Sequence, residues 1–265
     1  MNKTELLDKY ARDGESRLLL ARVLDQQQRA DQRGIPTHTA FLSPAEQAMS
    51  ADLLMAAAPG QGVLHGGYAD AERKLWGFLP DWLDEDLWLA GEDCPLAALE
   101  VKPPKGAKLT HRDYLGSLMG LGITREKIGD ILIGETGAQV IVLRETLPIL
   151  LAQWEKAGRY PVTLTPLPLD QLTPTPGETK EVRATVASVR LDAVVSAGFS
   201  IPRSRAADLI RGGRVMVNHR PCEKADKVVE AGDVLTCRGL GKCVLTEIGG
   251  TSKRGRTILT IQRYL

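Results

Sequence analysis

Residues 190–222 read R-L-D-A-V-V-S-A-G-F-S-I-P-R-S-R-A-A-D-L-I-R-G-G-R-V-M-V-N-H-R-P-C, and residues 228–233 read V-V-E-A-G-D. Apolar residues in the first part of this stretch have helical spacing, and Gly198 is expected to end that helix in a left-handed conformation. Ser200 is expected to open a second helix, with Pro202 near its first turn. The stretch therefore predicts two short helices joined by a turn and followed by strands.

Arginines accompany the second expected helix at Arg203, Arg205, Arg211 and Arg214. Packing does not require all of them, because four cations within about one helix repel one another unless anions meet them. Guanidinium groups match phosphate oxygens in geometry and also stack on bases. This part of the chain is therefore predicted to form a phosphate-binding surface.

The same stretch resembles the ribosomal-protein S-four type RNA-binding module, which is also called the alpha-L motif. The residues that carry the resemblance are Arg190-Leu191-Asp192, Ser200, Arg203, Ser204, Ala206, Ile210, Gly213, Val215, Val217-Asn218 and Gly232-Asp233. The rest of the chain resembles the YlmH type of bacterial and plastid proteins. In that family the module follows a helical N-terminal part and a plait-like middle domain.

The resemblance implies a non-enzymatic protein that docks on structured RNA. The expected partners are rRNA and tRNA on the large ribosomal subunit, and the expected role is ribosome-associated quality control or rescue of stalled translation. The family is also linked to cell division. No catalytic residue, cofactor or metal site is expected, and a monomer is expected.

The expected RNA-binding residues combine the module's marks with the cations around them. They are Arg190, Ser200, Arg203, Ser204, Arg205, Arg211, Arg214, Asn218, Arg220, Lys224, Lys227, Lys253, Arg254 and Arg256. Asn218 and Arg220, at a turn between strands, are candidates for contacts to sugar or base. The glycine-rich loop that holds the last three cations either approaches phosphate or is a solvated hairpin tip.

Charge is divided unevenly along the chain, although the formal net charge is only +1. Of the 34 Lys and Arg residues, 15 lie in residues 181–265, together with 8 of the 33 Asp and Glu residues. Residues 1–180 are therefore acidic overall. A basic end on an acidic body indicates that the end meets a polyanion.

The body shows the periodicities of a mixed α+β fold. Two helices within residues 3–33 and a third from the capping box at Ser43 to about Ala58 predict a helical region over residues 1–60. A short strand is expected at Phe41-Leu42. A hairpin is expected within residues 62–79.

From residue 96 the expected order is strand, helix, strand, strand, helix, strand, which is that of a ferredoxin-like plait over residues 61–168. The expected elements are strands at 96–103, 128–133, 139–143 and 160–167 and helices at 110–120 and 146–157. The two central strands at 128–133 and 139–143 hold no aromatic residue, so base stacking on the sheet is not expected. Prolines predict a stiff linker at 169–180, and the module occupies 181–265.

Two other functions remain open beside RNA binding alone. The triplet Arg190-Leu191-Asp192 also surrounds the catalytic aspartate of pseudouridine synthases, so an RNA-modifying enzyme anchored by the module is one alternative. Here the triplet lies inside the module, and Asp192 is expected to hold an arginine or cap its helix. The other alternative is a protein-interaction adaptor that docks through its acidic body.

The four cysteines are expected to be reduced thiols of a cytoplasmic protein, because none forms a C-x-x-C pair. A zinc site formed by Cys222, Cys237 and Cys243 with His219 is the less favoured alternative. No apolar run reaches the roughly 18 residues that a membrane span requires. The charged N-terminus lacks the apolar core of a signal peptide.

Overall fold

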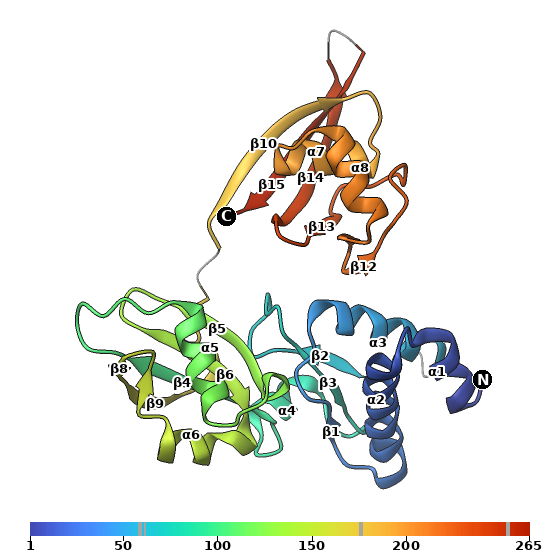
Figure 1. Ribbon diagram of the computed structural model, residues 1–265. Coiled ribbons are helices and arrows are strands. Elements are labelled where there is room, and N and C mark those ends of the chain that lie inside the picture. Colours follow the sequence, from blue (N-terminus) through green and yellow to red (C-terminus); the bar gives the residue numbers. More distant parts are fainter. Residues whose placement is uncertain (58–59, 61, 175–176, 253–254) are drawn as a thin grey trace. The chain divides into compact units, whose positions relative to one another are not determined.

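The computed structural model describes residues 1–57, 60, 62–174, 177–252 and 255–265 (Figure 1). The chain divides into two compact units, Met1–Thr175 and Pro176–Leu265. Helices and antiparallel sheets make up both units, which confirms the predicted α+β class. No helix in the described ranges is both long enough and apolar enough to cross a membrane.

The first unit begins with three helices that pack on a three-stranded antiparallel sheet. The helices are α1 (Lys3–Tyr10), α2 (Gly14–Arg33) and α3 (Pro44–Ala57), and the strands are β1 (Thr37–His38), β2 (Val63–His65) and β3 (Leu75–Phe78). Ser43 opens α3 as predicted, since its backbone N donates to Glu46 Oε2 at 2.6 Å. The sheet order β1-β3-β2 brings the hairpin β2–β3 against the helices.

Two expectations for this region are wrong. Phe41-Leu42 is not a strand: Phe41 is buried beneath Gly129, and Leu42 makes only an isolated bridge with Lys74. The boundary predicted at residue 60 separates the hairpin from its sheet. Trp76 and Phe78 of β3 belong to the core that the N-terminal helices form, so the hairpin is part of the N-terminal layer.

The second part of this unit is the predicted plait. Its elements are β4 (Leu96–Lys102), α5 (His111–Gly120), β5 (Ile128–Ile133), β6 (Ala138–Leu143), α6 (Leu147–Gln153) and β9 (Thr163–Leu167). The order β5-β6-β4-β9 with antiparallel neighbours is that of a ferredoxin-like sheet. Both helices pack their apolar residues into one core on the sheet.

Shorter elements complete this unit. They are α4 (Glu85–Ala90), the strands β7 (Lys156–Ala157) and β8 (Tyr160–Pro161), and the 3-10 helices Arg125–Lys127, Arg144–Thr146 and Leu169–Gln171. The second plait helix ends at Gln153 rather than near Ala157. Trp154 Nε1 donates to Ser117 Oγ and to the Lys156 carbonyl, both at 3.0 Å, which turns the chain into the β7–β8 hairpin.

A polar joint connects the N-terminal layer to the plait. Asp130 on β5 accepts from Tyr68 Oη at 2.8 Å and from the backbone N of Glu72 at 2.7 Å and of Arg73 at 3.0 Å. The Arg73 guanidinium donates to the carbonyls of Ile128 and Phe41. The Arg73 guanidinium thus bonds to the backbone of β5, an edge strand with a bulge near Ile128, and the Asp130 carboxylate bonds to two backbone N–H groups of the loop before β3.

The linker predicted at 169–180 is shorter in the structure. Leu169 and Leu172 pack on the core between the N-terminal layer and the plait, and Thr173 N donates to Gln139 Oε1 at 2.8 Å. At the other end, β10 already begins at Thr179, and Leu265 N donates to the Glu178 carbonyl at 3.0 Å. Most of this proline-rich stretch therefore belongs to one unit or the other: Leu169 and Leu172 pack on the first, and the strand that begins at Thr179 belongs to the second.

The second unit is a six-stranded antiparallel sheet with two short helices. Its elements are β10 (Thr179–Val186), α7 (Leu191–Phe199), α8 (Arg203–Arg211), β11 (Val215–Val217), β12 (Arg220–Pro221), β13 (Val234–Cys237), β14 (Gly241–Thr251) and β15 (Thr257–Tyr264). The sheet order is β10-β15-β14-β13-β11-β12. Val194 and Val195 of α7 and Ile210 of α8 are fully buried with the sheet in a core that belongs to this unit alone.

The left-handed residue that ends the first of its helices lies two positions later than predicted. Ser200, not Gly198, takes the left-handed conformation, with φ of 55°. Gly198 lies inside α7 against β14, where an added Cβ would stand 2.9 Å from Cys243 Sγ. Gly198 therefore permits close packing of helix on sheet, and Ser200 separates the two helices.

Removal of the charge at the polar joint is expected to destabilise the first unit. Asp130→Asn replaces an acceptor-only carboxylate that receives three hydrogen bonds, so the unfolding free energy should fall by about 2 kcal/mol. All four tryptophans lie in residues 76–154, so their fluorescence in a denaturant titration reports this unit selectively. The control is Asp70→Asn, which changes an exposed acid in the loop that holds Tyr68 and Glu72, and it should shift the midpoint of unfolding little. Equal midpoints for the two variants would contradict the role of Asp130.

Candidate nucleic-acid interface

A buried carboxylate anchors the basic surface of the second unit. Asp192 lies in the first turn of α7, and its side chain is only 8% exposed. Arg203, the first residue of α8, donates from Nε at 3.1 Å and from Nη2 at 3.0 Å to this carboxylate. Arg190 approaches the same group from the residue before α7, at 3.3 Å. Asp192 therefore holds arginines, as the sequence predicted, and ties the starts of the two helices together.

The two arginines that bind Asp192 remain partly accessible. The side chains of Arg190 and Arg203 are 40% and 53% exposed, and together with Asp192 they carry one net positive charge. A guanidinium has five N–H donors in a planar fork, so the edges that do not face Asp192 can meet phosphate oxygens. The ion pairs thus orient the arginines without using all of their donors.

Lys224 and Lys227 lie on a loop that runs beside the start of α7. Leu191 N donates to the Lys227 carbonyl at 2.8 Å, and Asp192 N donates to the Ala225 carbonyl at 3.0 Å. These bonds occupy the first backbone donors of the helix, so an anion would meet side chains here rather than the helix terminus. Both lysine side chains are exposed, which places two further cations near Arg190.

A second group of arginines forms where β13 ends. Arg214 Nη2 donates to the Arg238 carbonyl at 3.0 Å, and Arg238 N donates to the Arg214 carbonyl at 2.9 Å. Burial raises the pKa of Cys237, and the positive charges of Arg214 and Arg205 oppose this shift. Arg205 is exposed and has no hydrogen bond or ion pair with any residue in the described ranges.

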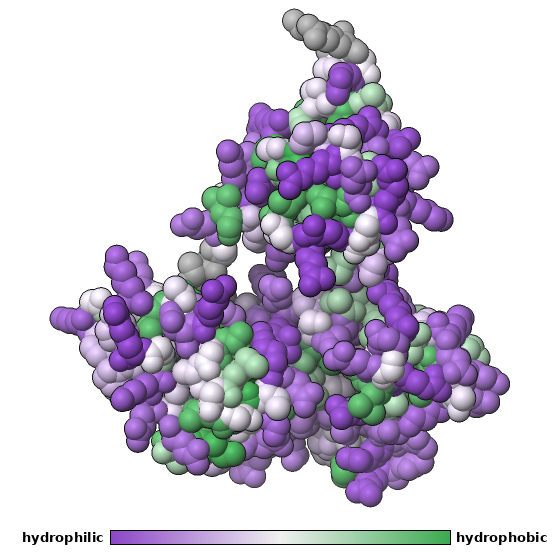
Figure 2. Space-filling view, viewed as in Figure 1, coloured by the Kyte–Doolittle hydropathy of each residue, from purple (hydrophilic) through white to green (hydrophobic). Residues whose placement is uncertain are grey.

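Arg238 was missed by the sequence analysis. It follows β13 directly and precedes the turn Gly239-Leu240-Gly241, and it is not one of the residues that carry the resemblance to the module. Only the pairing of its backbone with Arg214 brings it into this group. Hydrophilic residues crowd the part of the unit around α8, as Figure 2 shows.

Asn218 has a structural role, and its predicted contact to sugar or base stays a prediction. Its Nδ2 donates to Asp233 Oδ1 at 2.7 Å, and its Oδ1 accepts from Val234 N at 2.9 Å. It also takes a left-handed φ of 49° at the turn after β11. The side chain therefore fastens this turn to the start of β13.

The remaining predicted residues are dispersed. Arg211 pairs with Asp208 at 2.9 Å, and Arg256 Nη2 donates to the Thr185 carbonyl at 2.6 Å, far along the sheet from α8. Ser200 follows α7 and Ser204 lies within α8; both are exposed. Arg220 lies on β12. Lys253 and Arg254 lie outside the described residues.

The cysteines do not form the alternative zinc site. Within the described ranges, no three His, Cys, Asp or Glu side chains are grouped so that they could hold a metal ion. Cys237 and Cys243 are buried in the core, and burial raises the pKa of Cys243 to about 12. A thiol with so high a pKa stays protonated near neutral pH, whereas a thiolate is the form that binds metal or attacks a substrate.

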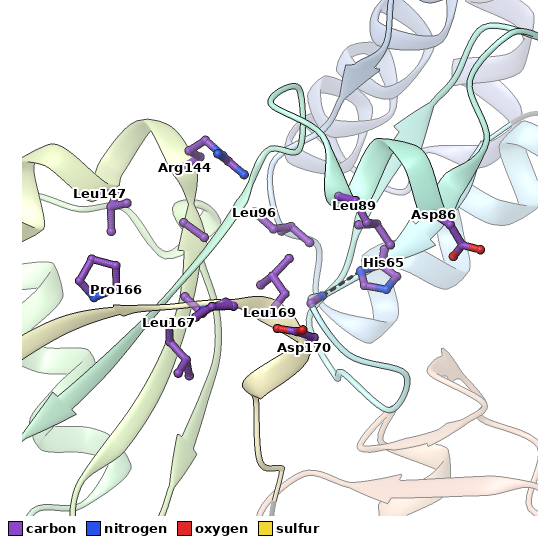
Figure 3. A pocket seen from close by; sticks show the side chains of 15 residues that line it. His65, Asp86, Leu89, Leu96, Arg144, Leu147, Pro166, Leu167, Leu169 and Asp170 are labelled. Atoms are coloured by element: carbon purple, nitrogen blue, oxygen red, sulfur yellow. Dashed lines mark hydrogen bonds between the residues drawn. The ribbon is translucent and has the colours of Figure 1, made fainter.

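The first unit has a hollow of about 620 Å³ (Figure 3). Leucine and proline side chains surround most of it, with His65 and Asp86 at one side and Arg144 at another. His65 Nδ1 accepts from Gly67 N at 3.0 Å, and burial lowers the pKa of this histidine. The described lining residues include no Ser, Thr, Cys or Lys, and their carboxylates are those of Asp86 and Asp170.

The ion pair with Asp192 gives Arg203 a structural role that Arg205 lacks. Arg203→Ala leaves the buried Asp192 carboxylate with Arg190 alone, so the unfolding free energy of the second unit should fall by about 1–3 kcal/mol. Arg205→Ala, at an exposed position without a partner in the described chain, should change it by about 0.5 kcal/mol or less.

Calorimetric unfolding of the full chain measures this difference, because the second unit contains no tryptophan. The double variant Asp192→Asn with Arg203→Ala should lose less unfolding free energy than the sum of the losses in the two single variants, because the ion pair is removed as a whole. Strict additivity would mean that the two side chains do not interact.

Comparison with known proteins finds family models for three consecutive parts of the chain. Three family models match: "YlmH, N-terminal" over residues 15–77, "Putative RNA-binding domain in YlmH" over residues 90–171, and "S4 domain" over residues 189–235. The first match ends within β3, so it includes the hairpin that the sheet also assigns to the N-terminal layer.

Individual relatives are also similar to this chain. The "Ribosome-associated protein quality control protein P2" of Bacillus subtilis (strain 168) is 36% identical over 231 residues, which cover 85% of this chain and 86% of that protein. A solved structure, "Cell division protein ylmH from Streptococcus pneumoniae", is 24% identical with a TM-score of 0.49, over 60% of this chain and 94% of that one. The identity and coverage of the B. subtilis relative show that the chain belongs to the YlmH-type family of RNA-binding proteins with a C-terminal S4 domain.

Proposed function

We propose that the chain docks on structured RNA of the ribosome, with the S4 domain as its principal contact. The arrangement around α8 supports this most directly: two groups of arginines lie at the surface, and one of them is oriented by the buried Asp192. The arginine and lysine side chains would meet phosphate and sugar, because helical RNA hides most base edges in a narrow groove.

The structural roles found above divide the proposed contacts into three classes. The proposed electrostatic contacts are exposed cations, namely Arg205, Arg214 and Arg238 with Lys224 and Lys227 of the neighbouring loop. Arg190 and Arg203 are proposed to combine contact with support, because they also hold Asp192. Ser200, Ser204, Arg211 and Arg220 are proposed to contribute at the edges of this surface.

The proposed setting is rRNA and tRNA on the large ribosomal subunit, in a cytoplasmic monomer that acts without catalysis. The B. subtilis relative is named for ribosome-associated quality control, which supports a role in handling stalled translation. The S. pneumoniae protein is named for cell division, and a disturbance of division is proposed as a consequence of impaired translation. The acidic body is proposed to place the S4 domain on its target.

Loss of the Arg214 group should weaken RNA binding without unfolding the chain. In the full chain, Arg205→Gln with Arg214→Gln removes two cations, so the slope of log affinity against log salt should fall by about 1.5–2. Fluorescence anisotropy with a labelled ribosomal RNA hairpin, at several salt concentrations, measures the slope. The control is Lys180→Gln with Arg183→Gln on β10, which removes the same charge elsewhere in the unit. If both double variants lose the same RNA affinity, the effect comes from net charge and not from the Arg214 group.

Residues 177–265 should bind RNA by themselves, because this unit has its own core and the basic excess. Co-sedimentation with large ribosomal subunits at matched salt compares this fragment with the intact chain and with residues 1–174. The fragment should bind more weakly than the intact chain and more tightly than residues 1–174. If residues 1–174 alone bind as tightly as the intact chain, the principal contact lies in the body and the proposal is wrong.

A further inference from the structure

One end of the plait carries a lysine-rich loop that the S4 surface does not include. β4 ends at Lys102, and residues 103–110, P-P-K-G-A-K-L-T, lead from there into α5. Lys102 pairs with Glu100 at 2.8 Å. Lys105 and Lys108 are exposed, and neither ammonium group has a hydrogen bond or ion pair with the part of the chain that the structure describes.

The loop has a defined shape and borders a hollow. Ala107 N donates to the Pro104 carbonyl at 3.1 Å, and Gly106 takes a φ of 83°, which closes a tight turn after two prolines. The hollow measures about 500 Å³ and lies between this loop and the β5–β6 turn at 134–137. Lys105 and Lys108 are among its lining residues, and Glu135 is the one acid among the described residues that line it.

A second basic segment lies beside this loop. Gly158, in the turn between β7 and β8, packs so closely that an added Cβ would lie 3.3 Å from both Leu109 Cδ2 and Asp113 Oδ1. This contact brings Lys156 and Arg159 to the end of the plait where α5 begins. The Arg159 guanidinium lies 5.0 Å from the Tyr160 ring centroid, which presents a cation and an aromatic ring together.

The acids at this end do not cancel its cations. Asp113 accepts from Thr110 N at 2.8 Å, and this bond, which caps α5, lowers the pKa of Asp113. The described segments 103–113, 134–137 and 155–160 hold three acids, which are Asp113, Glu135 and Glu155. The same segments hold five cations, which are Lys105, Lys108, Arg112, Lys156 and Arg159. A locally positive end thus stands on a body that is acidic overall.

We propose that this end of the plait, named here the lysine-loop end, binds the phosphate backbone of RNA as a second contact. Lysine ammonium groups act on phosphate as point charges and read no base, which fits a contact that positions the protein. The hollow gives phosphate groups a concave surface between the loop and the β5–β6 turn. The inference rests on the proposed function only in that the partner is RNA.

The sheet itself offers no competing route to RNA. β5 and β6 contain no aromatic residue on which bases could stack, so an RNA contact by the plait has to use its ends or loops. Acidic residues elsewhere on the body repel the polyanion and so favour approach by this end. Two sites on one chain make the second binding step intramolecular, so even a weak contact at the lysine-loop end raises the affinity of the whole protein.

The test compares three full-length variants with the natural chain. Lys105→Gln with Lys108→Gln removes the two unpaired loop cations. Arg29→Gln with Arg33→Gln, at exposed positions of α2, removes equal charge from the same unit and is the matched control. Arg205→Gln with Arg214→Gln reports on the S4 domain. Binding to purified large-subunit rRNA is measured over a range of salt, and tryptophan fluorescence checks that the first unit is folded.

The loop variant should bind on the order of tenfold more weakly at 0.1 M salt, with a salt slope smaller by about 1.5–2, while the control keeps the natural affinity. A loop variant that binds like the natural chain, or a control that weakens equally, overturns the inference. If the S4 variant weakens in those cases, the proposed function stands without the second contact. If polyglutamate binding falls in the loop variant but rRNA binding does not, the end recognises an acidic protein and the inference is wrong.

Discussion

The buried carboxylate of Asp192 is the constraint on which the basic surface of the S4 domain depends. An anion that is 8% exposed requires cations, and the fold supplies them from the residue before α7 and from the first residue of α8. Removing an arginine leaves the buried carboxylate short of a counter-charge, so a stable core requires arginines at this surface. Their orientation is set before any RNA arrives, which reduces the side-chain entropy that binding has to overcome.

The elements of both units were largely predictable because their periodicity and order are local properties of the sequence. The plait followed from alternating helix and strand patterns, and the S4 domain from its spaced residues. Roles that depend on contacts distant in sequence were not predictable. The sequence at a strand turn does not show that the Asn218 side chain bonds to Asp233 and to the backbone of Val234. Arg238 joined the site only through the pairing of its backbone with Arg214.

The boundary within the body shows the same limit. The hairpin β2–β3 looks like part of the plait because it precedes it in sequence, but Trp76 and Phe78 bury their side chains with the N-terminal helices. The two layers then meet through Asp130, which accepts from the backbone N of Arg73, and through the Arg73 guanidinium, which donates to the Ile128 carbonyl of the edge strand. A directional polar contact of this kind fixes one arrangement of the layers, whereas apolar contact alone tolerates sliding. The lysine-loop end therefore belongs to a body with a single defined geometry.

The pairing of β10 with β15 places the first and last strands of the S4 domain side by side. Thr179 is opposite Tyr264, and the amide of Leu265 reaches the carbonyl of Glu178. A domain whose entry and exit are neighbours occupies little more room in a chain than a short loop. It can be inserted between two residues of a surface turn in an unrelated scaffold without pulling that scaffold apart. The same closeness means that a fluorescent protein fused after Leu265 would stand at the junction with the body, so an internal label on an exposed helix would be the better reporter.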